Sequence, residues 1–407
     1  MTLTYKSLFS FFLILAPLWW VLGFNVFIYP FFVLACCILG IKRLKLSLGF
    51  KEVFFVFFLL YCFSRLLLLL PWVDLSRWAA SFYNLMLMAS GFGFYLILKQ
   101  SKRYSLAYCE ILSVSFFYVA SAYVLIFLYA FVVGNFQLEH LTLLGHIFSG
   151  VDLPGILNAA KTAIYSRVEW GFGFSTPRVV FLSDFPTSAA LLIAVLSFAF
   201  FYLRGSCVTF YQALTVDFLA VLAVATTLSR VMFLSYIVAA LVWYCVVYWG
   251  KLRKYRSLFV GLFVMLWCLV VFYAINYLPH IASLRSNSGS VRLESYLLAI
   301  ELSLDHPFFG IGVKPLGLSD IHIPVGSHST LLSTLVKFGY LGAFAVVVFF
   351  AGCVRDCVRR SGVAVAVRGV VPVILWMLFQ DVDAYALQAL LCFSVFGVLQ
   401  RRSFNEV

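Results

Sequence analysis

The chain has 407 residues and a formal net charge of +13; 64% of its residues are hydrophobic and only 11% are charged. A soluble domain carries roughly 25% charged residues, so this composition excludes a soluble fold. The apolar residues come in runs of about twenty, which is the helix length that crosses roughly 30 Å of hydrocarbon. We therefore predict one transmembrane domain over residues 1–407.

The hydrophobic runs predict an all-α bundle of about twelve transmembrane helices. The predicted spans are residues 7–22, 24–41, 52–71, 79–98, 107–133, 186–203, 208–227, 231–250, 257–276, 329–352, 369–379 and 384–400. No small-residue cleavage site follows the first run, so we interpret it as a retained helix and not a signal peptide. Gln380, Asp381 and Asp383 separate the last two short spans and predict an external turn or a re-entrant pair.

Two connections are far longer than the rest, residues 135–185 and residues 277–328. Long ordered loops in compact proteins usually carry function. Within the second loop, residues 290–304 predict an amphipathic helix that lies on the membrane surface or covers a cavity.

The basic residues are concentrated in five short clusters. They lie at residues 42–51, 99–103, 251–256, 355–360 and 401–402. Each cluster follows an even-numbered apolar run, which is the positive-inside pattern. It predicts that both termini are cytoplasmic and both long loops periplasmic, and it explains the net charge without nucleic-acid binding.

Four arginines outside these clusters are candidates for binding a phosphorylated ligand, because a planar guanidinium binds diphosphate in bidentate fashion. Arg230 ends a short connection at the outer edge of the hydrocarbon; the alternative is an arginine that snorkels to lipid headgroups. Arg178 and Arg292 are either ligands for phosphate or surface charges with local partners. Arg285 lies in the second long loop.

His328 is the strongest candidate for chemistry. It lies where the second long loop meets the next predicted span, and histidine is the usual general base near neutral pH. A hydrogen-bonded structural histidine is the alternative. The nearby glycines Gly310 and Gly312 follow no strand and open no helix, so they indicate a tight turn and not a nucleotide site.

Several of these residues resemble the motifs of the O-antigen ligase and O-antigen polymerase superfamily. Residues 328–342, HSTLLSTLVKFGYLG, resemble its histidine motif, and residues 305–312, DHPFFGIG, resemble the PxxGxG turn that precedes it. Arg230 with Leu234 is similar to an arginine, three residues, leucine element, and Arg178 more loosely to an arginine ahead of a turn. Two residues depart from the family: Ser329, where asparagine is common, and Lys337, near an acidic position.

The resemblance, over roughly residues 175–345, implies a GT-C-type bundle in the bacterial inner membrane with a periplasmic active site. It implies a metal-independent inverting glycosyltransferase whose donor is an undecaprenyl-diphosphate-linked glycan, with no cofactor. The implied catalytic residues are His328, Arg230 and Arg292, and the implied substrate-binding residues are Arg178, Arg285, Ser329 and Lys337. The expected partners are a glycan or lipid A-core acceptor, membrane lipid and a chain-length regulator.

Three functions remain open at this point. A repeat-unit polymerase comes first, because the sequence around His328, with Lys337, resembles polymerases more than ligases. A ligase that transfers the glycan to lipid A-core is the close alternative. A lipid-linked oligosaccharide flippase belongs to another class; it needs charges along its lumen, whereas the polar residues here concentrate in the outer loops.

The predicted topology can be tested by cysteine labelling. In a variant without native cysteines, we expect Ser101→Cys to react with a membrane-impermeant maleimide only after spheroplasts are permeabilised, because the second basic cluster is predicted to be cytoplasmic. Ser149→Cys, in the first long loop, is the control and should react in intact spheroplasts. Labelling of Ser101→Cys in intact spheroplasts would contradict this topology.

Overall fold

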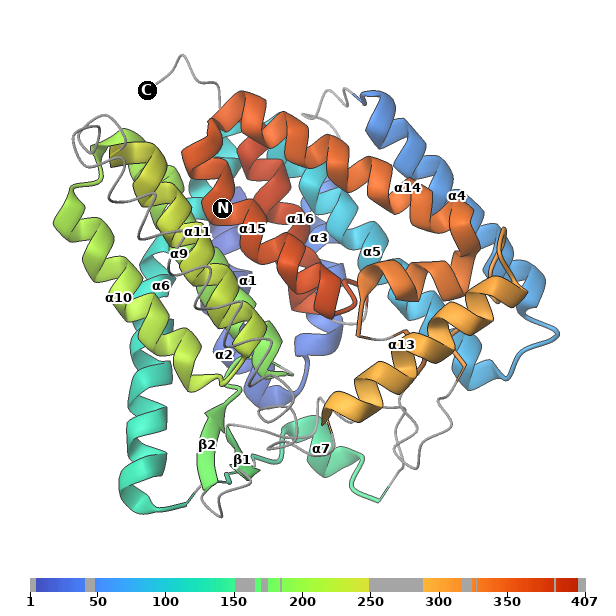
Figure 1. The fold of residues 1–407 in the computed structure, drawn as a ribbon, viewed down its shortest axis with the longest axis horizontal. Coiled ribbons are helices and arrows are strands. Elements are labelled where there is room, and N and C mark those ends of the chain that lie inside the picture. Colours follow the sequence, from blue (N-terminus) through green and yellow to red (C-terminus); the bar gives the residue numbers. More distant parts are fainter. Residues whose placement is uncertain are drawn as a thin grey trace, which may run out of the picture.

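The computed structural model describes residues 5–40, 48–135, 137–138, 140–150, 165–169, 175–183, 185–248, 288–315, 324–326, 328–383 and 386–401. These residues form a bundle of helices with one short β-hairpin at one end (Figure 1). The helices are α1 (Tyr5–Ile14), α2 (Ala16–Leu22), α3 (Asn25–Gly40), α4 (Phe50–Leu69), α5 (Leu75–Gln100), α6 (Lys102–Val133), α7 (Leu143–Ile147), α9 (Pro186–Arg204), the 3-10 turn η1 (Gly205–Cys207), α10 (Phe210–Thr226), α11 (Arg230–Tyr248), α13 (Ser288–Asp305), α14 (Thr330–Ser361), α15 (Val363–Phe379) and α16 (Ala386–Arg401).

The predicted all-α membrane bundle is confirmed in this coarse form. Six of the described helices, α4, α5, α6, α9, α11 and α14, are long and apolar enough to cross a membrane, and four further apolar helices are shorter. The count of about twelve spans stays a prediction, because the expected helix at residues 257–276 lies outside the described residues.

Several element boundaries differ from the prediction. The first expected span is broken at Leu15 into α1 and α2, where Pro17 occupies the first turn of α2; proline lacks the N–H that a continuous helix would need. Helix α14 runs on to Ser361 because its stop is Gly362, which adopts a left-handed φ of 77°. The first long loop contains an antiparallel hairpin, β1 (Tyr165–Glu169) and β2 (Ser175–Val179), which the sequence analysis did not predict.

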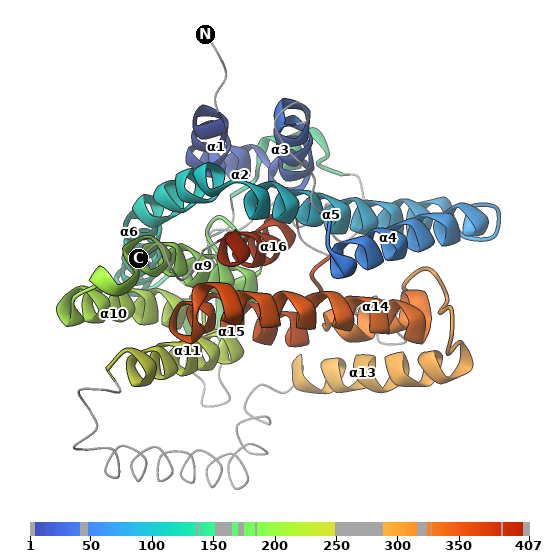
Figure 2. The ribbon, with the colours of Figure 1, turned by 90° about the horizontal axis from the view of Figure 1, so that it is seen from above.

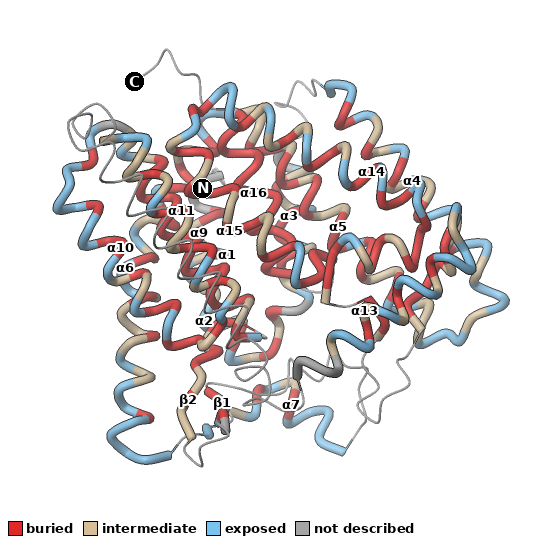
Figure 3. Tube along the Cα trace, viewed as in Figure 1, coloured by how far each residue is buried: buried red, intermediate tan, exposed pale blue. Residues whose placement is uncertain are grey.

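Two helices lie at the centre of the bundle. Nearly every residue of α9 and α16 is buried, as the burial colours of Figure 3 show. Helix α16 lies between α5 on one side and α14 and α15 on the other (Figure 2). Burial on all faces explains why these two helices are apolar around their whole circumference and show no amphipathic stripe.

The bundle has two chemically different ends. The hairpin, α7 and α13 lie at one end (Figure 1), which we call the His328 end because His328 directly precedes α14 there. At the other end Lys51, Lys99, Arg355, Arg360 and Arg401 surround one pocket. We call it the basic end; it unites four of the five predicted basic clusters, as the positive-inside pattern requires.

Helix α14 is sharply kinked at Gly339, which has φ 65° and ψ −164°. The turn of residues 306–312 docks into this kink. The amides of Ile311 and Gly312 donate to the carbonyls of Val336 and Lys337 at 2.8 and 2.7 Å, and the Tyr340 amide donates to the Pro307 carbonyl at 2.7 Å. The turn thus forms hydrogen bonds with backbone groups of α14 that lose their partners within the helix at the kink.

The docking requires glycine on both sides of the contact. A Cβ atom on Gly310 would lie 2.5 Å from the Lys337 carbonyl carbon, and one on Gly339 would lie 2.4 Å from that of Phe308. Both glycines also have left-handed φ values, 63° and 65°. The tight turn predicted from the glycine spacing is therefore confirmed, and its role is to let two backbones touch.

Gly310→Ala should destabilise the protein much more than Gly134→Ala. Both positions are left-handed, with φ 63° and 70°, but a Cβ on Gly134 would meet nothing within 4 Å. The left-handed conformation alone costs alanine about 1–2 kcal/mol, so Gly134→Ala measures that cost and Gly310→Ala adds the backbone clash. We expect a clearly larger fall in the thermal unfolding midpoint in detergent for Gly310→Ala; equal midpoints would show that the docking is not rigid.

Candidate functional site

His328 is held from one side by helix α13. The hydroxyl of Tyr296 donates to the His328 carbonyl at 3.0 Å, and the Gly326 amide donates to Ser295 Oγ at 3.2 Å. Ser295 and Tyr296 are adjacent on α13, so this helix fixes the backbone on which the imidazole is mounted. The predicted amphipathic helix is therefore present, and it lies against the segment that leads into α14.

From the other side, the start of α14 is fixed by the turn between α15 and α16. Thr330 Oγ1 donates to the Gln380 carbonyl at 2.8 Å and accepts from the Val382 amide at 3.0 Å. The hydroxyl thus bridges a donor and an acceptor of one tight turn. His328, two residues earlier, lies between α13 and that turn.

Beneath this segment lies a buried network of four charges. Lys314 pairs with Asp381, and Lys337 pairs with Asp383; Lys314 Nζ also lies 3.7 Å from Asp383 Oδ1. All four residues are at least nine-tenths buried. Burying a charge is costly unless it is paired, so two lysines and two aspartates in contact form the arrangement that makes such burial tolerable.

The surroundings of His328 keep its imidazole neutral. Burial, and then the positive charges of Arg292 and Lys314, lower the pKa of His328 from 6.5 to about 4. Its Nδ1 atom is buried and has no hydrogen-bond partner among the described residues. At neutral pH this histidine is therefore unprotonated and able to accept a proton, which is the state that a general base requires.

Arg178 and Arg230 form a second group. Arg178, on β2, donates from Nε to the Thr227 carbonyl at 3.0 Å, in the short connection where Leu228 has a left-handed φ of 51°. Arg230 is the first residue of α11 and is exposed. The first long loop is thereby attached to the connection that carries Arg230.

The structure brings the predicted residues together only in part. Arg292 acts electrostatically on His328, and Arg178 contacts the connection before Arg230. These interactions lie within each group, and Figures 1 and 2 place the starts of α11 and α13 at the same end of the bundle. The convergence of Arg230 with His328 on one ligand thus stays a prediction. Arg285 lies outside the described residues.

Ser329 and Lys337 have structural contacts that the sequence did not indicate. Ser329 is the N-cap of α14, and its hydroxyl accepts from the Leu332 amide at 3.5 Å. Lys337 is only 1% exposed and is paired with Asp383. Their roles in binding substrate remain predictions; the geometry favours a part in shaping the site.

Sequence reasoning missed Lys314 and Tyr296, and it assigned Asp381 and Asp383 only to a turn. A signal was available for the aspartates, because ionisable residues beside apolar spans call for a buried partner of opposite charge. Asp217 on α10 is likewise buried and paired: Arg368 Nη2 lies 2.6 Å from its Oδ2, and Tyr236 donates to its Oδ1 at 2.8 Å.

Comparison with known protein families matches residues 215–347 to the family described as O-antigen ligase. This range includes Arg230, Arg292 and His328, the three residues that the resemblance implies are catalytic. It confirms the resemblance to the O-antigen ligase and polymerase superfamily. No curated protein matches the chain.

The charge of Arg292 should be visible in the pH dependence of activity. The general-base role predicted for His328 requires a neutral imidazole and is lost as pH falls through its pKa, so the acid limb of kcat/KM should lie near pH 4. Arg292→Gln removes a nearby positive charge, which raises the pKa of His328 toward 6.5 and moves the limb to higher pH.

Arg359→Gln, at the basic end, is the matched control and should leave the limb in place. The position of the limb can be read even if Arg292→Gln lowers the overall rate. An acid limb at the same pH in both variants would mean that Arg292 does not act on the catalytic base.

Proposed function

Starting from the match of residues 215–347 to the O-antigen ligase family, we propose that the protein is a glycosyltransferase of the bacterial inner membrane. It transfers a glycan from an undecaprenyl-diphosphate-linked donor to an acceptor hydroxyl at its periplasmic face. The observation that carries this proposal is a neutral, half-buried His328 fixed beside Arg292 at the end of the bundle where the hairpin, α7 and α13 lie.

The chemistry needs one base and a stabilised leaving group. The acceptor oxygen attacks the anomeric carbon while the bond from that carbon to the diphosphate breaks, which inverts the anomeric centre. His328 takes the proton from the attacking hydroxyl. Arg292, with Arg230 and Arg178, neutralises the charge that develops on the diphosphate, the task that magnesium performs in many phosphate enzymes.

Two acceptors are supported by different observations. The sequence around His328, with Lys337, favours a second lipid-linked repeat unit, which makes the protein an O-antigen or polysaccharide polymerase. The description of the matching family favours lipid A-core, which makes it a ligase. We propose the polymerase as the first function and the ligase as its alternative.

The flippase of the third hypothesis is disfavoured by the buried charges. Arg368 with Asp217, Lys337 with Asp383 and Lys314 with Asp381 are matched pairs inside the described bundle. A transporter lumen needs charges that can exchange partners with the cargo. Each of these six charges is already paired within the protein, so none of them is available to a cargo.

The lipopolysaccharide of a deletion strain distinguishes these functions. Loss of the ladder with one repeat unit retained on the core indicates a polymerase, whereas bare core with accumulated lipid-linked polymer indicates a ligase. Bare core with lipid-linked single repeat units trapped in the inner leaflet would point to the flippase and overturn the proposal.

His328→Ala should reduce turnover by about 10²- to 10⁴-fold, the usual contribution of a general base, while donor binding survives. The matched control is His146→Ala, because His146 is an exposed histidine of α7 at the same end of the bundle. Turnover is measured in membranes that contain equal amounts of each variant. Near-normal activity of His328→Ala would remove the general-base assignment.

A further inference from the structure

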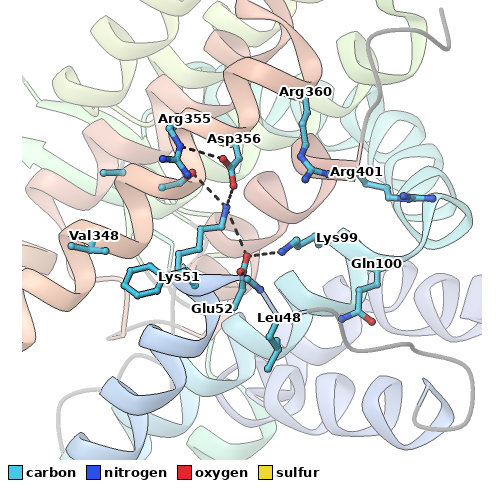
Figure 4. A pocket seen from close by; sticks show the side chains of 14 residues that line it. Leu48, Lys51, Glu52, Lys99, Gln100, Val348, Arg355, Asp356, Arg360 and Arg401 are labelled. Carbon is cyan, nitrogen blue, oxygen red and sulfur yellow. Dashed lines mark hydrogen bonds and ion pairs between the residues drawn. The ribbon is translucent and has the colours of Figure 1, made fainter.

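The basic end carries a cavity of about 860 Å³ that the reaction at the His328 end does not use. It lies among α4, α5, α14 and α16, where α4 begins and α5 and α16 end (Figure 4). Three of these helices, α4, α5 and α14, are long and apolar enough to span a membrane. A cavity at their ends lies at the level where lipid headgroups meet water.

The cavity wall carries a surplus of positive charge. Five basic and two acidic side chains line it, an excess of three positive charges. The acidic ones are already compensated: Glu52 accepts from Lys99 at 2.6 Å, and Asp356 pairs with Lys51. Arg355 Nε also lies 3.4 Å from Asp356 Oδ1. The two other arginines of the wall, Arg360 and Arg401, are therefore the cations available for an anion from outside the protein.

Arg360 and Arg401 are the main part of this surplus. Arg360 Nη1 donates to the carbonyl of Gln400 at 3.2 Å, a neutral partner. Within the described ranges, no carboxylate lies within ion-pair distance of either arginine. Two guanidinium groups at one cavity wall suit a phosphate, which they can bind in bidentate fashion.

An unpaired amide group adds an independent indication of a ligand. Both polar atoms of the Gln100 side chain are buried without a partner among the described residues. Gln100 lines the cavity. Buried polar atoms are nearly always satisfied, so this amide calls for a polar molecule that supplies both a donor and an acceptor.

The edge of the cavity is apolar. Phe50 lines it and is 81% exposed, and Leu48, beside it in the wall, is also exposed. An isolated phosphate ion would have no use for such a border. An amphiphile would, because its chains could lie along the exposed apolar faces of α4 and α14 while its headgroup occupies the cavity.

From these observations we infer that the cavity between α4, α5, α14 and α16 binds the phosphate headgroup of an anionic membrane lipid. Arg360 and Arg401 bind the phosphate, and Gln100 binds the polar part of the headgroup. Basic pockets between transmembrane helices commonly bind such headgroups. The phosphate can come from a glycerophospholipid or from an isoprenyl phosphate, and the headgroup chemistry is shared by both.

Native mass spectrometry of the full-length protein in detergent tests this inference. Cardiolipin, phosphatidylglycerol, undecaprenyl phosphate and phosphatidylcholine are added in separate arms. We expect at least one anionic lipid to bind in preference to phosphatidylcholine, and the strongest arm identifies the source of the phosphate. Arg360→Gln/Arg401→Gln should weaken that binding by roughly 25-fold, about fivefold for each arginine near the membrane surface.

The control is Arg103→Gln/Arg359→Gln, which removes two exposed arginines near the same end that do not line the cavity. It should bind like the wild type. Gln100→Met keeps the side-chain size and the fold while it removes the amide, and it should weaken binding severalfold even if the double arginine variant is unstable. Equal losses in the two double variants, or no preference for anionic lipid in the wild type, would overturn the inference. Because the assay uses no donor, its result is independent of the proposed glycosyl transfer.

Discussion

Two lysines and two aspartates buried together beneath His328 are the constraint on which the site depends. Each comes from a segment that cannot bury its charge alone: Lys314 from the loop after the glycine turn, Lys337 from α14, and Asp381 and Asp383 from the turn between α15 and α16. Removing one member would leave an uncompensated charge in the interior, which costs more than the pair contributes. The network therefore specifies how three distant parts of the chain meet, and His328 is positioned by that meeting.

The hydrogen bonds around the network also fix the position of His328. Thr330 attaches the start of α14 to the turn between α15 and α16, and Tyr296 attaches α13 to His328. The imidazole is thus mounted on backbone fixed from two sides, while its own ring nitrogen Nδ1 has no partner within the described structure. A base that is held in place yet not already hydrogen-bonded through that nitrogen is suited to a proton that arrives with the substrate.

The sequence predicted those features of the fold that depend on a local pattern of residues. Apolar runs located most helices, and basic clusters located one end of the bundle, because both follow from the hydrocarbon thickness and from charge bias. The glycine turn was predictable since Gly310 and Gly312 stand outside any strand or helix start.

The ion-pair partners of Lys337 and Asp217 could not be predicted. Pairs such as Asp217 with Arg368 join residues 151 positions apart, and the spacing of residues along one chain does not show which distant residues meet. The hairpin of β1 and β2 was missed because strands of five residues give too little alternation to recognise.

The contact between Gly310 and Gly339 has a consequence for finding distant relatives of this protein. Neither position can gain a side chain unless the opposing backbone moves away, so we expect the two glycines to be kept together or replaced together in related sequences. The hydrogen bonds of the contact come from residues 307–312 and 336–340, and the connection between these two segments is free to lengthen or shorten without breaking them. A search that requires the glycine of the turn and the glycine of the helix kink, and allows the interval to vary, would therefore detect the fold even in chains whose histidine has been replaced and whose chemistry has been lost.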